Sequence, residues 1–385
     1  MGCRLIPGRQ PDSCAFPPSS GMMQIPRPQV MSMRRPPLPL LAMALALSAV
    51  ALVHAADDLV LSRFSDYLDA LRTQAGIPGL AAAIVGPDDV NWEGAFGQQD
   101  VERNVAARLD TPFQLDGTTQ AVVASLAMRC ASDGSLSLED PVSKFAPSSP
   151  DAGATIRQLL THTTAGVNGL TFSYRPERLG PVAGAIAGCT DSTFRWGMSA
   201  LFDRMAMIDS VPGSDVVLLT APAEAFTASA LRRYSDVLGR IATPYTVDAR
   251  GRARPSSYVA STLTPASGLV STVRDLEQFD LALKQGILLR PEWRTLAWTP
   301  PAGANGQPLP HAYGWFSQAY NGGRILWQFG VSDSGSSSML ITLPQRGLTL
   351  ILLANSPGLA RPFDLSAGDV TVSPFARLFL SIFVR

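Results

Sequence analysis

The sequence predicts an α/β fold in which helices flank an antiparallel sheet and an all-α lobe is inserted into it. Three observations support this prediction: an apolar strand pair at 79–97, a mainly helical middle, and three apolar strands at 325–354 before a terminal helix. Hydrophobic residues make up 46% of the 385 residues and charged residues 16%, so the chain can bury a large core.

Residues 1–55 are expected to form a leader outside this fold. An Arg-Arg pair at 34–35 precedes an apolar run at 38–53, and Ala55 ends a small-residue segment. That order is typical of a secretory signal peptide, here about 33–55, and the apolar run is short for a membrane span. We therefore expect a periplasmic or secreted protein with no stable membrane span after cleavage.

The rest of the chain, 56–385, is expected to be one domain. Apolar spacing predicts a helix at 58–76, two strands at 79–85 and 91–97 around a polar turn, and a helix at 118–132. An all-α lobe should occupy roughly 117–290. Further helices of the lobe are expected at 155–161, 178–188, 194–206 and 275–285. After the lobe, we expect strands at 325–329, 337–343 and 348–354 and a helix at 373–384.

Composition excludes several classes of function. The formal net charge is zero, whereas nucleic-acid binding needs a clustered cationic surface. No Cys/His cluster is present, so no metal or other cofactor is expected. Cys130 and Cys189 could pair in an oxidising compartment, but the sequence does not bring them together, and two separate thiols are the favoured interpretation.

Several ordered segments resemble one family. They are similar to segments of serine β-lactamases of class C and related penicillin-binding proteins. The segments are Phe113-Gln114-Leu115 before a helix, the stretch 133–142, Thr155 to Thr164 with its "IRxLLTHT" pattern, 265–276 (PASGLVSTVRDL) and 343–355. The resemblance covers roughly 58–385 and implies the β-lactamase/transpeptidase-like fold. It also implies a Ser and a Lys one helical turn apart (S-x-x-K), a Tyr in Y-x-N, and a strand motif K-T-G or H-x-G.

The catalytic pair of that family is missing. Alignment on Phe113 puts Gly117 at the nucleophile position and Gln120 at the amine position. The chain has only two lysines, Lys144 and Lys284, and neither has a serine three residues before it. Hence no S-x-x-K exists in any register, and no amine is available to take a serine proton.

The remaining motif positions are also altered. No tyrosine has an asparagine two residues later, and Tyr174 is the best candidate for the tyrosine, although it could equally be an ordinary core or surface residue. Gln328 and Gly330 stand in the strand motif. Thr118 and Thr119 could offer a hydroxyl beside Gly117, but an unactivated hydroxyl is a poor nucleophile.

Three other polar residues are given structural interpretations. Asp116 is interpreted as a helix N-cap, because an acidic residue directly precedes the helix. His162 is expected to be a satisfied core residue and His311 a loop residue.

The sequence thus predicts an exported, non-hydrolytic binding protein of the cell envelope, with ligand contacts from Thr118, Thr119, Gln120, Tyr174, Gln328 and Gly330. Its ligand would be a peptidoglycan fragment, a small peptide or an envelope protein. Without a fixed cation, the site should prefer neutral amide or sugar groups over carboxylates, and Gly117 should leave room for a ligand group. The alternative is an active hydrolase of the same family with non-standard catalytic residues, acting on β-lactams, esters or D-amino-acid peptides.

Overall fold

A computed structural model describes residues 58–384, except 220–225, 249, 259–260 and 334. The described residues belong to one compact unit, Ala56–Arg385. The predicted leader lies outside the described residues, so its export function stays a prediction. Within the described ranges, no helix is both long and apolar enough to span a bilayer.

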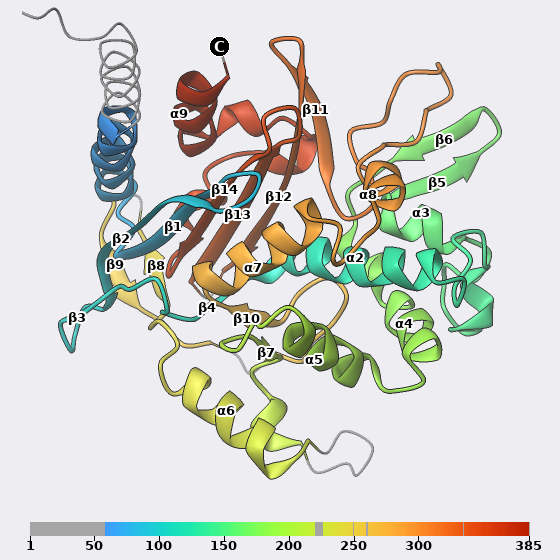
Figure 1. Ribbon diagram of the computed structural model, residues 1–385, viewed down its shortest axis with the longest axis horizontal. Helices are drawn as coiled ribbons and strands as arrows, with labels where there is room; N and C mark the ends of the chain where they lie inside the picture. Colours follow the sequence, from blue (N-terminus) through green and yellow to red (C-terminus); the bar gives the residue numbers. More distant parts are fainter. Residues whose placement is uncertain (1–57, 220–225, 249, 259–260, 334, 385) are drawn as a thin grey trace, which may run out of the picture. The chain divides into compact units, whose positions relative to one another are not determined.

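A seven-stranded antiparallel sheet forms the centre of the molecule (Figure 1). Its strand order is β11-β12-β13-β14-β1-β2-β3. The strands are β1 Gly79–Val85, β2 Val90–Asp100, β3 Val105–Ala106, β11 Phe316–Tyr320, β12 Gly323–Ser332, β13 Ser336–Leu343 and β14 Leu348–Ala354. The strands predicted from the apolar runs are all present, and β12 extends further at both ends than expected.

Both faces of the central strands are covered, which explains why they are almost uniformly apolar. Alternate residues of β1 point to opposite faces, as the period of two requires, so Ala81 and Ala83 join one core cluster and Leu80 and Ile84 the other. Helices α2, Thr119–Ser132, and α7, Val273–Lys284, pack on the first face. The second face is covered by the helical residues 58–74 and by α9, Pro374–Phe383.

The helical lobe is confirmed, and the structure adds two helices that the sequence analysis did not predict, α6 between 194 and 275 and α8 after 285. The helices are α2 Thr119–Ser132, α3 Ile156–Leu160, α4 Val182–Thr190, α5 Phe194–Arg204, α6 Ala228–Leu238, α7 Val273–Lys284 and α8 Pro291–Ala297. Helix α3 begins with a capping box in which Thr155 and Gln158 bond reciprocally.

A disulfide joins two helices of the lobe, so the prediction of two separate thiols was wrong. Cys130 on α2 and Cys189 on α4 are bonded, with their Cα atoms 5.9 Å apart. The packing of α4 against α2 brings the two side chains together across 59 residues of sequence, which no local pattern could indicate.

Three small sheets were not predicted. They comprise strands of two to four residues, too short for a hydrophobic period to be detected. They are β4 Phe113–Gln114 with β10 Leu269–Ser271 and β7 Val211–Pro212; β5 Thr163–Gly166 with β6 Gly169–Phe172; and β8 Tyr245–Val247 with β9 Ala253–Pro255.

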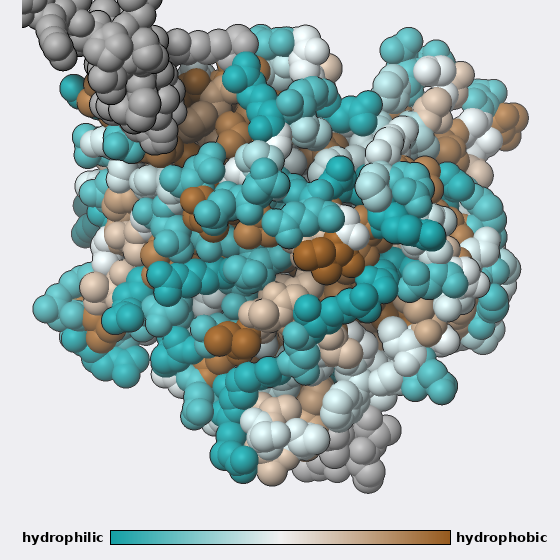
Figure 2. Space-filling model, in the orientation of Figure 1, coloured by the Kyte–Doolittle hydropathy of each residue, from teal (hydrophilic) through white to brown (hydrophobic). Residues whose placement is uncertain are grey.

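The molecular face in Figure 2 is mainly hydrophilic, with apolar side chains in small, separated patches. Scattered apolar side chains of this kind are normal on the surface of a globular protein.

Candidate functional site

A cavity of about 300 Å³ lies where the motif alignment places the family's catalytic cleft. Its walls come from the start of α2, the segment after β6, the loop before β10, and β12. The lining residues are Asp116, Gly117, Gln120, Tyr174, Pro176, Ala266, Ser267, Phe329, Val331 and Ser332. Gly117, Gln120 and Tyr174 are therefore neighbours in space, as the motif alignment implies.

A directional chain of hydrogen bonds fixes the polar side of this cavity. The backbone N–H of Arg175 donates to His162 Nδ1 at 3.1 Å, so the proton of the neutral ring must sit on Nε2. His162 Nε2 then donates to Gln120 Oε1 at 2.9 Å, and Gln120 Nε2 donates to Tyr174 Oη at 2.8 Å. Each donor is determined by the preceding bond, which leaves the Tyr174 hydroxyl proton free for the cavity.

Burial keeps every member of this chain neutral. It lowers the pKa of His162 to about 3, with the positive charge of Arg178 adding to the effect. It raises the pKa of Tyr174 well above its ordinary value, although the bond from Gln120 opposes this. A neutral histidine and a neutral tyrosine therefore stand beside Gln120, where the family's alignment places an ammonium group.

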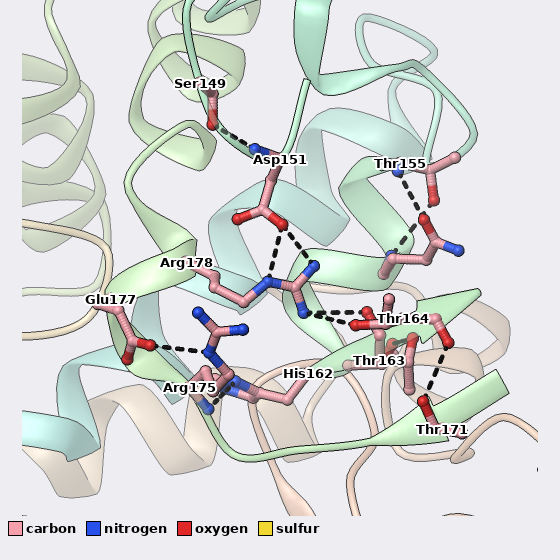
Figure 3. A network of polar contacts seen from close by, with 12 residues as sticks. Ser149, Asp151, Thr155, His162, Thr163, Thr164, Thr171, Arg175, Glu177 and Arg178 are labelled. Atoms are coloured by element: carbon pink, nitrogen blue, oxygen red, sulfur yellow. Dashed lines mark hydrogen bonds and ion pairs between the residues drawn. The ribbon is translucent and has the colours of Figure 1, made fainter. Parts of the chain in front are cut away.

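Arg178 holds the segment that carries Tyr174 in place (Figure 3). Its guanidinium is buried, pairs with Asp151 at 2.9 Å, and donates to the Thr163 carbonyl at 3.1 Å. In Figure 3, His162 and the Arg175 backbone meet just beside this anchor. The expectation that His162 is a satisfied buried residue is confirmed, and the structure adds that it orients Gln120.

The nucleophile position is closed to a side chain. A Cβ atom on Gly117 would lie only 2.4 Å from the Phe329 carbonyl oxygen on β12. The expectation that Gly117 leaves room for a ligand group is therefore wrong, because the backbone of β12 takes up that space. The close approach of β12 to the start of α2 also requires a glycine at position 330, because a Cβ atom added to Gly330 would lie 1.9 Å from the Leu115 carbonyl oxygen.

Four of the residues proposed as ligand contacts lie outside the cavity wall. Thr118 is fully buried and its hydroxyl contacts Ser338 Oγ at 2.7 Å. Thr119 is also buried and accepts a bond from the Leu269 N–H. Gln328 points into the core, where its amide donates to the Gly314 carbonyl at 3.1 Å, and Gly330 is a packing glycine. Their neighbours Phe329 and Val331, on the opposite face of β12, line the cavity instead.

One further interpretation needs correction. Asp116 does not cap a helix, because its Oδ2 accepts a 2.6 Å bond from Ser336 Oγ on β13 and no side-chain cap is made. His311 lies in the loop before β11, as expected, but it is buried, and its ring is edge-on to that of His162 with the ring centroids 4.6 Å apart. Sequence reasoning missed these contacts because the partners lie far away in the chain.

Sequence reasoning also missed Ala266, Ser267 and Ser336 as contributors to the site. The first two belong to the 265–276 segment that carries the family resemblance, so that match contained a signal for the cavity wall. Among the described residues, no group of His, Cys, Asp and Glu is arranged to hold a metal ion.

Two features define the class of β-lactamase-like and penicillin-binding-like serine hydrolases. One is a large antiparallel sheet with an inserted helical lobe. The other is a cleft between the start of α2, the segment that carries Tyr174 and the sheet strand β12. The chain belongs to the Beta-lactamase family, whose model matches residues 64–195 and 219–369.

Solved structures share the fold at low sequence identity. A class C β-lactamase from Rhodobacter sphaeroides matches with a TM-score of 0.61 and 17% identity, over 84% of this chain and 99% of that one. The D-alanine carboxypeptidase AmpC from Burkholderia cenocepacia matches with a TM-score of 0.63 and 19% identity, over 84% of this chain and 99% of that one. The octameric penicillin-binding protein homologue from Pyrococcus abyssi matches with a TM-score of 0.65 and 17% identity, over 83% of this chain and 77% of that one.

Protein flp of Staphylococcus aureus is a similar curated protein. It is 24% identical over 312 residues, which is 72% of this chain and 60% of Protein flp. The chain therefore spans 60% of the length of that relative.

Proposed function

We propose that the protein is a non-hydrolytic binding protein of the bacterial cell envelope, built on the β-lactamase fold. The observation that carries the proposal is the closed nucleophile position: Gly117 faces the Phe329 carbonyl so closely that even a Cβ would collide. A side-chain nucleophile cannot stand there unless β12 moves.

The amine position supports the same proposal. Gln120 is neutral, and both ends of its amide are engaged by His162 and Tyr174. It cannot accept a proton at neutral pH, so it cannot activate a hydroxyl. The nearest hydroxyls on the helix, those of Thr118 and Thr119, are buried and bonded elsewhere.

The test is covalent acylation. Purified protein is incubated with a β-lactam and with an activated acyl probe, and intact mass is measured. We expect no adduct on either treatment. A stoichiometric adduct that maps to a cavity residue would overturn the proposal in favour of an active hydrolase with non-standard residues.

Restoring the motif residues should not restore acylation. The double variant Gly117→Ser/Gln120→Lys supplies the missing pair, but the new serine side chain would need β12 to retreat from the 2.4 Å contact. Gly117→Ala is the matched control for the Cβ alone. Efficient acylation of the double variant would show that the strand moves readily and that the closed position does not block the chemistry.

Export to the periplasm or the medium is part of the proposal. It is supported by the leader pattern and by the Cys130–Cys189 disulfide, which suits an oxidising compartment. N-terminal sequencing of the exported protein should find a start within about two residues of Ala56. Recovery of full-length chain with its leader intact in the cytosol would count against export.

A further inference from the structure

Asp116 carries the formal charge of the cavity. Among the described residues that line it, no Lys, Arg or His is present, and the other polar groups are Gln120, Tyr174 and two serines. The sequence-based expectation of a ligand with neutral amide or sugar groups did not take this carboxylate into account.

The backbone at Asp116 is in an uncommon conformation. Its φ is +47°, in the left-handed region that is strained for most non-glycine residues and that Asp and Asn tolerate best. A glycine would adopt this turn without strain, so the turn alone does not require a carboxyl group. The conformation directs the carboxyl to Ser336 and to the cavity wall.

The Asp116 carboxyl has no cationic partner among the described residues. Ser336 donates to Oδ2, and no other described residue donates a hydrogen bond to the carboxyl. Burial raises its pKa to about 6, against the opposing effect of the Ser336 bond, so it is mostly ionised at neutral pH. A partly buried carboxylate without a countercharge is unfavourable, and a ligand cation would offset that cost.

The same cavity offers the Tyr174 hydroxyl as a donor. Its oxygen already accepts from Gln120, and the chain of bonds that starts at the Arg175 N–H prevents the amide from turning round. Phe329, Val331 and Ala266 supply apolar parts of the cavity wall. The cavity volume, about 300 Å³, is at the small end of the range for small-molecule sites.

We infer that this cavity binds small amino-acid amides, such as the free amino terminus of a short peptide. The ammonium group would lie on the Asp116 carboxylate, the amide carbonyl would accept from the Tyr174 hydroxyl, and an apolar side chain would pack on Phe329 and Val331. The inference rests on the proposed function, since it assigns the ligand class of a cleft that binds without reacting.

Isothermal titration with valinamide, N-acetylvalinamide and valine tests this assignment. Acetylation removes the cation, and valine replaces the amide by a carboxylate that Asp116 would repel. At pH 7.5 we expect valinamide, as its L or D form, to bind at least tenfold more tightly than either analogue. Equal affinity for N-acetylvalinamide, or no binding of valinamide, would overturn the inference.

The variant Asp116→Asn should remove the preference for valinamide over N-acetylvalinamide, and Tyr174→Phe should weaken both amides alike. Asp191→Asn is the matched control, because Asp191 is also left-handed (φ +49°) but is exposed and outside the cavity. Unchanged valinamide binding in Asp116→Asn would overturn the role of Asp116.

The unmodified protein provides a second measurement if the variant does not fold. Among the described residues, the titratable groups near Asp116 are Tyr258, whose pKa is raised by burial and by the charge of Asp116, Tyr174 on the cavity wall, and His162, which bonds Gln120. None of these changes charge between pH 5 and 7.5, whereas Asp116 does. Valinamide affinity should therefore fall about tenfold at pH 5.

A pH-independent affinity would contradict the inference. The proposed function is tested separately, because an acyl adduct would refute it whatever the amide titration gives. Loss of valinamide binding without acylation would remove only the ligand class.

Discussion

Two glycines control how closely β12 approaches the start of α2. The Phe329 carbonyl sits over Gly117, and Gly330 lies against the Leu115 carbonyl and the Ser338 hydroxyl. At this scale a backbone contact limits the site, because the close approach takes the volume that a side chain at position 117 would need. The alignment identified Gly117 as the altered position, but the space around it depends on a strand more than 200 residues away.

We expect Gly330→Ala to destabilise the protein by about 3 kcal/mol, at the upper end of overpacking costs, because the new methyl group would meet a backbone oxygen at 1.9 Å. Gly153→Ala is the control, since nothing lies within 4 Å of its Cβ position. It should change the free energy of unfolding by less than about 0.5 kcal/mol. Urea unfolding measures both, and equal stability of the two variants would show that β12 shifts at little cost.

At the scale of elements, the predictions succeeded where one segment carries its own pattern. The apolar runs of β13 and β14 and the helical spacing of α7 were sufficient to locate them. They failed where an element exists only through a distant partner: β4 and β7 have two residues each and are held by β10. The disulfide was missed for the same reason, since the packing of α4 on α2 brings its cysteines together.

Removing that disulfide should lower the free energy of unfolding substantially. The bond closes a loop across 59 residues, and loop-closure entropy predicts a loss of about 4 kcal/mol. The double variant Cys130→Ala/Cys189→Ala, measured by urea unfolding beside the oxidised parent, should show this loss. The parent treated with reductant should approach the stability of the variant. A variant as stable as the oxidised parent would mean that the bond contributes no net stability.

At the scale of the whole molecule, residues from the segments that resemble the family line one cavity, while the direction of side chains around it was not predictable. Gln328 and Phe329 are adjacent in sequence, yet only Phe329 reaches the cavity, because successive residues of a strand point to opposite faces. Similarly, the left-handed backbone at Asp116 directs its carboxyl group to the cavity wall, and no sequence motif indicates that conformation.

Buried ionisable groups throughout the fold predict a stability maximum in mildly acidic solution. Burial raises the pKa of Asp275 to about 7 and of Glu277 to about 8, with nearby Glu93 adding to the second shift. Their neutral forms favour the folded state, so the stability they give is complete below about pH 4 and is lost as the pH rises toward 8.

His162 and His311 act in the opposite direction. Burial lowers the pKa of His162 to about 3 and that of His311 well below its ordinary value of 6.5. The stability from their neutral forms is complete above about pH 6.5 and is lost as the pH falls toward 3. The two trends oppose each other, and the free energy of unfolding should peak at about pH 5–6.

Urea midpoints measured from about pH 4.5 to 8.5 test this maximum. In Glu277→Gln the decline between about pH 6 and 8 should become shallower, because the neutral amide has no proton to lose on the way to alkaline solution. The exposed Glu292→Gln is the control and should follow the parent curve. A midpoint that rises steadily through pH 8 in the parent, or an unchanged slope in Glu277→Gln, would show that these buried carboxyls do not set the alkaline limit of stability.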